Sequence, residues 1–160
     1  MTTTDQVIDR RTTRRVKLSS VTPEIYRAML ALDDAVGQSG IERSLAELVR
    51  IRASQVNGCA YCIDMHTLDA RSVGESEQRI YALSAWRETP FFNARERAAL
   101  ALVESITLVH EGHVPDDIYA EAAAVFDEDE LARLIWLMIV INAWNRIGIA
   151  GRLEPGHYTP

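Results

Sequence analysis

Apolar residues recur every three or four positions along most of the chain, a spacing that predicts amphipathic helices. Proline, glycine and capping residues divide this pattern into separate segments. Helices are expected over approximately residues 23–36, 42–56, 59–74, 77–86, 93–110, 115–125 and 128–147. No segment shows the apolar–polar alternation of a half-buried strand. The predicted fold class is therefore all-α, a single-domain helical bundle.

Several helix ends carry signals of their own. Thr22 is expected to cap the first helix, with Pro23 in its first turn, and Asn57-Gly58 is expected to end the second. The spacing of a capping box occurs twice, in Asn93–Glu96 and Asp127–Glu130. These signals place the helix boundaries from the sequence alone.

The last helix is apolar nearly all round, which predicts a central helix or one in a subunit interface. Its polar residues Asn142, Asn145 and Arg146 need hydrogen-bond partners if they are buried. The three tryptophans are expected to fill the core; they are Trp86, Trp136 and Trp144. The apolar surface also predicts a homo-oligomer.

The length of 160 residues fits one domain. Residues 1–21 are expected to be an N-terminal arm, 22–151 the helical domain and 152–160 an irregular C-terminal tail. A hydrophobic fraction of 48% and a charged fraction of 25% are typical of a globular protein.

Charge and hydropathy limit the partners. The formal net charge of −6 disfavours nucleic-acid binding, and the basic residues gather only in the arm, at Arg10, Arg11, Arg14, Arg15 and Lys17. The N-terminus has no apolar stretch of signal-peptide length, and the strongest apolar run, Leu134 to Ile141, is too short to cross a bilayer. We therefore expect a cytoplasmic protein with no membrane contact.

The strongest chemical signal is a Cys-x-x-Cys pair, Cys59 and Cys62, with His66 four residues later and Glu47 twelve residues before. Offsets of three, four and seven fall on one helix face, so Cys59, Cys62 and His66 can line one cleft. In a reducing cytosol such a pair is more often catalytic or metal-binding than structural. Two inert buried cysteines are the plainer alternative.

Other cysteine sites fit less well. A structural zinc site needs four ligands, and beyond the motif the chain offers only His110, His113 and His157. Haem attachment requires a histidine directly after the second cysteine, where Ile63 stands. A thioredoxin fold would place a strand before Cys59, and none is predicted. We therefore expect no metal and no bound cofactor.

Thiol chemistry requires a thiolate, and two features can supply one. Cys59 stands at a predicted helix start, where backbone amides favour a negative sulfur. Cys62 has His66 one turn along, and Glu47 can orient that imidazole. Local physics alone favours Cys59 as nucleophile, because it is nearer the helix start and expected to be more exposed.

These four residues and their spacing resemble the redox branch of the alkylhydroperoxidase D or carboxymuconolactone decarboxylase family, and the likeness runs from about Pro23 to Gly151. The resemblance implies the small all-α fold of that family and assembly into trimers or hexamers. It implies that Cys62 attacks the peroxide, its proton drawn toward His66 and Glu47, and that Cys59 resolves. The implied reductant is a lipoyl-type or thioredoxin-like dithiol, expected to attack Cys59.

The predicted function is accordingly a thiol-dependent peroxidase that reduces hydrogen peroxide or small organic hydroperoxides. One alternative is a noncatalytic redox-sensing module, and another is an enzyme acting on a carbonyl or lactone substrate. Weaker site candidates are Ser54, Tyr61 and Asp64. His110 and His113 are attributed to a helix end, where histidine complements the dipole.

Overall fold

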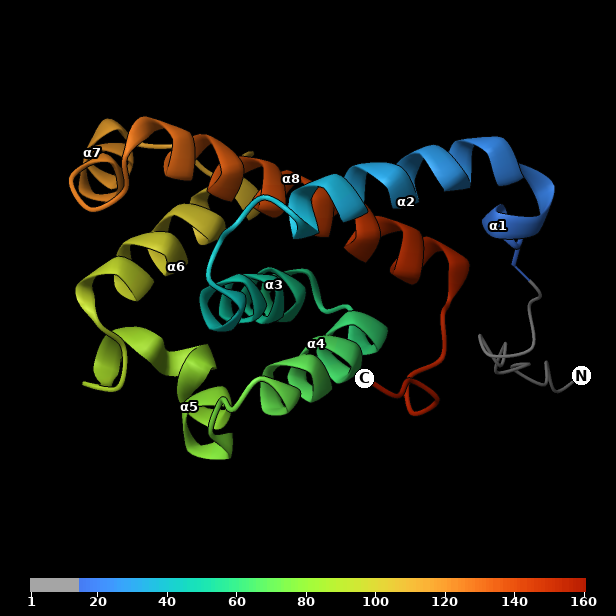
Figure 1. Cartoon of the computed structure of the whole chain (residues 1–160), viewed down its shortest axis with the longest axis horizontal. Helices are drawn as coiled ribbons and strands as arrows, with labels where there is room; N and C mark the ends of the chain where they lie inside the picture. The colour runs from blue at the N-terminus through green and yellow to red at the C-terminus, as the bar shows by residue number, and fades with distance from the viewer. Residues whose placement is uncertain (1–14) are drawn as a thin grey trace, which may run out of the picture.

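The computed structural model describes residues 15–160, which form helices and connecting segments without strands (Figure 1). The predicted all-α class is confirmed. The elements in order are α1 (Leu18–Val21), α2 (Pro23–Gly37), α3 (Arg43–Asn57), α4 (Ala60–Ser72), α5 (Glu77–Ala82), the 3-10 helix η1 (Leu83–Glu88), α6 (Ala94–Thr107), α7 (Asp116–Ala123) and α8 (Glu128–Gly151).

Helix α3 lies at the centre and packs against α4, α6 and α8 (Figure 1). One side of α3, which includes Leu45 and Val49, joins a core formed mainly with α6 and α8. Another side, which includes Leu48 and Ile51, joins a second core with η1 and α6. Helix α3 is covered on several sides and can therefore hold a functional side chain in a fixed position. Glu47 lies on this helix.

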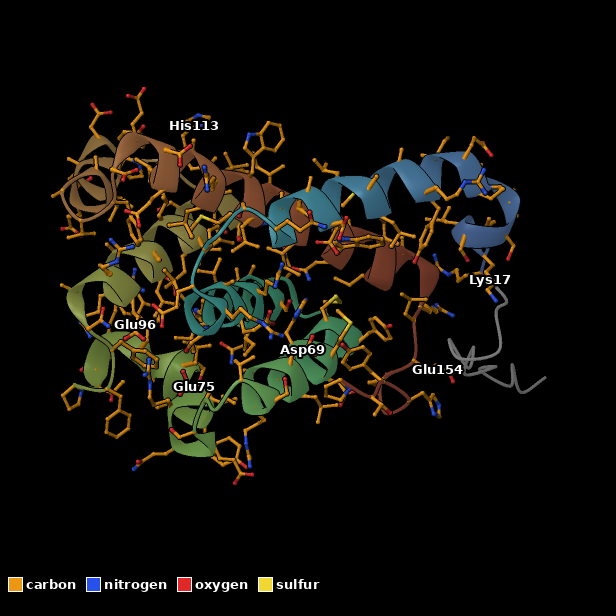
Figure 2. All side chains as sticks on the ribbon, in the orientation of Figure 1. Lys17, Asp69, Glu75, Glu96, His113 and Glu154 are labelled. Atoms are coloured by element: carbon orange, nitrogen blue, oxygen red, sulfur yellow. A yellow bond between two sulfur atoms is a disulfide. The ribbon has the colours of Figure 1, made fainter. Side chains whose placement is uncertain are left out.

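Both predicted capping boxes are present. The Asn93 side chain accepts from the Glu96 amide while Glu96 accepts from the Asn93 amide, and Asp127 and Glu130 exchange the same pair. The Arg79 guanidinium also donates to Glu96 Oε1 at 2.5 Å, and this contact ties α6 to α5. Glu75 and Glu96 are labelled in Figure 2. Each box satisfies two amides that the helix itself leaves unpaired.

The chain departs from the expected boundaries at several places. Residues 18–21, placed in the arm, form the one-turn α1, and the Thr22 side chain bonds back to Leu18 O at 3.2 Å instead of capping α2. The segment expected over 77–86 divides into α5 and η1, and α6 ends at Thr107. Arg10, Arg11 and Arg14 lie outside the described residues.

Helix α8 is longer than expected, and its burial is one-sided. Leu134, Leu137 and Ile141 are buried, whereas Trp136 is 52% exposed, so the prediction that all three tryptophans fill the core is wrong for Trp136. By length and composition α8 could cross a membrane, but it packs as a core helix against α2, α3 and α6. This packing accounts for the buried apolar face of α8 and leaves Trp136 on its outer face.

Candidate active site

The two cysteines follow a tight turn between α3 and α4. Gly58 adopts a left-handed conformation with φ of 69°, which glycine tolerates without steric cost, and it ends α3 as the Asn57-Gly58 pair predicted. The Cys59 amide donates to Ser54 O at 2.9 Å, so the turn is closed by a backbone hydrogen bond. Cys59 then caps α4, its Sγ accepting from the Cys62 amide at 3.4 Å.

Cys59 and Cys62 form a disulfide, with their Cα atoms 5.4 Å apart. Both are buried, and Cys59 is 1% exposed against 3% for Cys62. The expectation of an exposed Cys59 is therefore wrong. Position at a helix start does not expose a residue when another helix covers that start.

Helix α8 provides this cover through Gly148. A Cβ added at Gly148 would lie 3.1 Å from Cys59 Sγ and 3.6 Å from Cys62 Sγ. A methylene in that place would crowd the sulfurs, so the absence of a side chain lets the α8 backbone close over the disulfide. The spacing of the motif gave no signal of this residue, because α8 is distant in sequence.

Glu47 and His66 form a buried pair beside the cysteines. His66 Nδ1 lies 2.9 Å from Glu47 Oε2, and Arg50 Nη1 lies 2.5 Å from the other oxygen, Oε1. Burial by itself raises the pKa of the Glu47 carboxyl, but the His66 hydrogen bond and the Arg50 charge outweigh burial and bring the pKa below its ordinary value. Glu47 is therefore a carboxylate at neutral pH.

The ionised state of Glu47 determines how His66 is oriented. A carboxylate only accepts hydrogen bonds, so Nδ1 must carry the proton shared with Glu47. In the neutral imidazole Nε2 is then the acceptor nitrogen. The ring is thus prepared to accept a proton at Nε2 while Glu47 supports the resulting positive charge.

A cavity of about 200 Å³ lies against this group, and its wall includes Cys62 and His66 but not Cys59. The rest of the wall comes mainly from α2, α4 and α8, with several apolar side chains: Tyr26, Leu30, Tyr61, Met65, Ile141, Trp144 and Leu153. Tyr26 and Trp144 meet edge to face with ring centres 5.5 Å apart. The cavity gives a small, partly apolar molecule access to Cys62.

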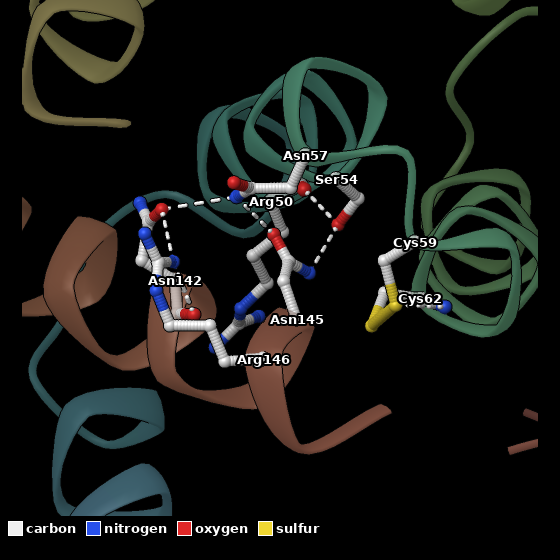
Figure 3. Close-up of a disulfide and its surroundings, with 8 residues drawn as sticks. All are labelled: Arg50, Ser54, Asn57, Cys59, Cys62, Asn142, Asn145 and Arg146. Atoms are coloured by element: carbon white, nitrogen blue, oxygen red, sulfur yellow. Dashed lines mark hydrogen bonds between the residues drawn. A yellow bond between two sulfur atoms is a disulfide. The ribbon is translucent and has the colours of Figure 1, made fainter. Parts of the chain in front are cut away.

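A polar network joins α3 to α8 next to the disulfide (Figure 3). The Asn57 amide donates to Asn142 Oδ1 at 3.0 Å and to Asn145 Oδ1 at 2.8 Å. Asn145 in turn donates to Ser54 Oγ at 2.9 Å. The predicted need for partners on α8 is thus met, and the network ties the end of α3, just before the Cys59 turn, to α8.

Ser54 therefore has a different role from the one its spacing suggested. It shares the Glu47 face of α3 in sequence, but its hydroxyl bonds Arg50 O at 2.7 Å and Asn145. Tyr61 lines the cavity, and Asp64 accepts from the Gly156 amide at 2.7 Å. His110 and His113 lie on the exposed segment after α6, away from these residues.

Asp69 is a neighbour of His66 that the motif did not indicate. Its Oδ2 lies 3.8 Å from His66 Nδ1, and its Oδ1 accepts from Tyr158. Glu47, His66 and Asp69 place ligand atoms within 4.8 Å of one another, a set that could hold a metal ion. Arg50 binds the Glu47 carboxylate, and its charge opposes a cation there. The i, i+3 spacing from His66 was the signal available for Asp69.

Comparison with known proteins identifies the family. The model of the carboxymuconolactone decarboxylase family matches residues 23–105. The chain is 47% identical to the uncharacterized protein YdfG of Bacillus subtilis over 137 residues, 86% of this chain and 93% of that protein.

Solved structures agree with this assignment. A protein of unknown function from Agrobacterium tumefaciens, described as a candidate antioxidant defence protein AhpD, is 36% identical, with a TM-score of 0.87 over 91% of this chain and 100% of the other. The debrominase Bmp8 shares the fold at 19% identity, with a TM-score of 0.73 over 84% of this chain and 73% of the other. The chain belongs to the carboxymuconolactone decarboxylase family and has the fold of its AhpD-like members.

Proposed function

We propose that the protein is a thiol-dependent peroxidase whose nucleophile is Cys62. The observation that supports this most strongly is that Cys62 shares a cavity with His66, which is hydrogen-bonded to the buried carboxylate of Glu47. A base held beside a thiol lowers the cost of forming the thiolate. Cys59 lies within disulfide distance as the resolving cysteine.

The proposed oxidation begins with the reduced pair. His66 Nε2 takes the Cys62 proton, and the thiolate attacks the terminal oxygen of a hydroperoxide, breaking the O–O bond. The departing oxygen takes the proton from His66 and leaves as an alcohol, or as water from hydrogen peroxide. The Cys59 thiol then displaces hydroxide from the Cys62 sulfenic acid, giving the disulfide and water.

A dithiol reductant restores the pair. Since the cavity reaches Cys62 and α8 covers Cys59, we expect attack on Cys62 Sγ, not on Cys59 as the resemblance implied. Cys59 leaves as a thiolate, stabilised at the start of α4 by the amide that its sulfur already contacts. The second thiol of the reductant then attacks the reductant sulfur of this mixed disulfide. Cys62 leaves as a thiolate, and the reductant becomes a disulfide. A cavity of about 200 Å³ favours a lipoyl-type arm over a folded thioredoxin-like partner.

Turnover and trapping together test the proposal. Peroxide consumption is measured with a panel of dithiols for the wild type, Cys59→Ser and Cys62→Ser. Both variants should lose steady-state turnover, but Cys59→Ser should still form a sulfenic acid that a dimedone-type probe traps, and Cys62→Ser should not. Sulfenate on Cys59 in Cys62→Ser at the wild-type rate would reverse the roles.

The same assays separate the alternatives. A disulfide that forms slowly without turnover would indicate a redox-sensing module. Product analysis would identify chemistry on a carbonyl or lactone substrate. The peroxidase reading requires no metal, and it suits a reducing compartment such as the cytoplasm, where a reversible disulfide can serve catalysis.

A further inference from the structure

The C-terminal segment, residues 152–160, folds back on the helix that carries Cys62 and His66 (Figure 1). It forms no helix, as expected, but two hydrogen bonds fasten it to α4. The Gly156 amide donates to Asp64 Oδ2 at 2.7 Å, and the Tyr158 hydroxyl donates to Asp69 Oδ1 at 2.8 Å. Leu153 contributes to the wall of the Cys62 cavity. The segment therefore lies against the site and not free in solvent.

Asp69 links this segment to the imidazole. The carboxylate that Tyr158 holds through Oδ1 presents Oδ2 to His66 Nδ1 at 3.8 Å, and His66 Nδ1 also lies 2.9 Å from Glu47. The Asp69 side chain is 22% exposed and that of His66 is 9% exposed, so solvent screens their interaction only in part. One ring nitrogen thus faces two carboxylates from different helices.

A second hollow, of about 560 Å³, lies on the Asp69 side of the pair. Its wall includes Glu47, Asp69 and Tyr158, whereas the wall of the Cys62 cavity includes His66. Asp33 and Arg50 belong to both walls. Glu47 and His66 therefore stand between an opening that reaches the thiol and a polar opening that the tail borders.

We propose that Asp69 and Tyr158 are positioning residues of the thiol site: Tyr158 holds the Asp69 carboxylate beside His66, and that carboxylate stabilises the imidazolium formed when Cys62 loses its proton. The inference rests on the proposed use of Cys62 as a thiolate. The proton moves from Cys62 Sγ to His66 Nε2 and no other bond changes. Arg50 neutralises part of the Glu47 charge, so Glu47 alone stabilises the charged ring less than a free carboxylate would. The Asp69 carboxylate adds to this stabilisation.

Tyr158 is suited to remain a donor. Burial and the hydrogen bond to Asp69 raise its pKa to about 12, so the hydroxyl keeps its proton throughout the neutral range. The titratable and charged groups around His66 come from α2, α3, α4 and the tail; they are Tyr26, Asp33, Glu47, Arg50, Tyr61, Cys62, Asp69 and Tyr158. Of these, Asp69 and Tyr158 connect His66 to the tail.

The thiolate titration of the full-length Cys59→Ser protein, which has Cys62 as its single thiol, tests the proposal. Asp69→Asn should raise the apparent pKa of Cys62 by up to about one pH unit, and Tyr158→Phe should raise it by less. Asp69→Glu, which keeps the charge, should recover part of the shift. Ultraviolet thiolate absorbance and the rate of alkylation against pH both report the titration.

Two control variants separate positioning from mere docking of the tail. Asp64→Ala removes the oxygen that accepts from the Gly156 amide but leaves Asp69 beside His66, and Tyr81→Phe removes a hydroxyl from a residue that is 72% exposed on α5. Both should titrate as the parent does. If Asp64→Ala raised the pKa of Cys62 as much as Asp69→Asn, or if Asp69→Asn left it unchanged, the proposal would be overturned.

Peroxide turnover is measured separately. A wild type that consumes no peroxide, with an Asp69-dependent thiolate titration, would remove the proposed function and leave the positioning role in place. The reverse result, turnover with a titration that ignores Asp69 and Tyr158, would remove the positioning role alone. The two proposals therefore fail on different measurements.

Discussion

At the scale of single residues, the site depends on what each side chain is set against. Glu47 is buried yet ionised, because His66 and Arg50 each bond one of its oxygens. Gly148 matters because it has no side chain where α8 meets the sulfurs. Cys59 is a helix cap whose exposure is determined by a residue almost ninety positions away, a fact that local physics could not supply.

Gly148→Ala should disfavour the disulfide. The added methyl would lie 3.1 Å from Cys59 Sγ, and overpacking of this kind costs about 1–3 kcal/mol. Thermal unfolding of the oxidised protein and its rate of reduction by dithiothreitol measure the effect. Gly151→Ala, on the same helix with nothing within 4 Å of the added methyl, is the matched control and should unfold as the wild type does. Equal behaviour of the two variants would contradict close packing at the disulfide.

Glu47 should contribute stability that disappears in acid. Its folded pKa lies below the ordinary value, so the unfolded chain binds its proton first as pH falls, and the contribution is present at neutral pH and lost on acidification through the folded pKa. Glu47→Gln should therefore be less stable than the wild type at neutral pH and show a flatter loss below about pH 5. Urea unfolding at a series of pH values measures this. A wild-type slope in the variant would show that Glu47 is not the group that titrates.

At the scale of elements, α3, α4 and α8 assemble the site. The α3–α4 turn positions the two cysteines, and α3 supplies Glu47. Helix α8 covers the sulfurs and forms hydrogen bonds with polar side chains of α3. The network through Asn57, Asn142, Asn145 and Ser54 fixes the distance between α3 and α8 (Figure 3). Hydrogen bonds are directional, so they specify this approach more strictly than apolar contacts can.

Asn145→Ala should weaken the union of α3 with α8. It removes two hydrogen bonds and leaves the Asn57 amide and the Ser54 hydroxyl with one partner fewer, at a cost of about 2 kcal/mol or more. Urea unfolding measures the change. Gln38→Ala is the comparison. It deletes an exposed side-chain amide, at the end of α2, that donates to Asp34 one turn earlier, and it should lower the free energy of unfolding by less than about 0.5 kcal/mol. Similar losses in the two variants would mean that the buried network contributes little.

At the scale of the whole molecule, the exposed apolar surface on α8 remains to be covered. Trp136 is 52% exposed and Ile139, one turn along, is 44% exposed. An aromatic side chain with a neighbouring aliphatic one on the outer face of a long helix is typical of an interface between proteins. We therefore retain the prediction of a homo-oligomer, a trimer or hexamer, and place α8 in its contact.

Trp136→Glu should dissociate that assembly without unfolding the subunit, because the residue lies on the outer face of α8 and a carboxylate is costly to bury in an apolar contact. Light scattering gives the mass, and circular dichroism reports the fold. Tyr81→Glu, which alters an aromatic residue that is 72% exposed on α5, should leave the mass unchanged. A wild type that is monomeric at micromolar concentration would refute the prediction.

Most of the helices and the candidate site residues could be predicted from local patterns in the sequence. Apolar spacing predicted the helices, and Asn93–Glu96 and Asp127–Glu130 marked two starts correctly, since capping depends on neighbours within one turn. The motif likewise named Cys59, Cys62, His66 and Glu47. How these elements meet became visible in the folded chain: α8 buries Cys59 behind Gly148, Ser54 bonds Asn145, and the tail brings Tyr158 to Asp69. Contacts between segments far apart in the chain depend on packing, which local patterns do not encode.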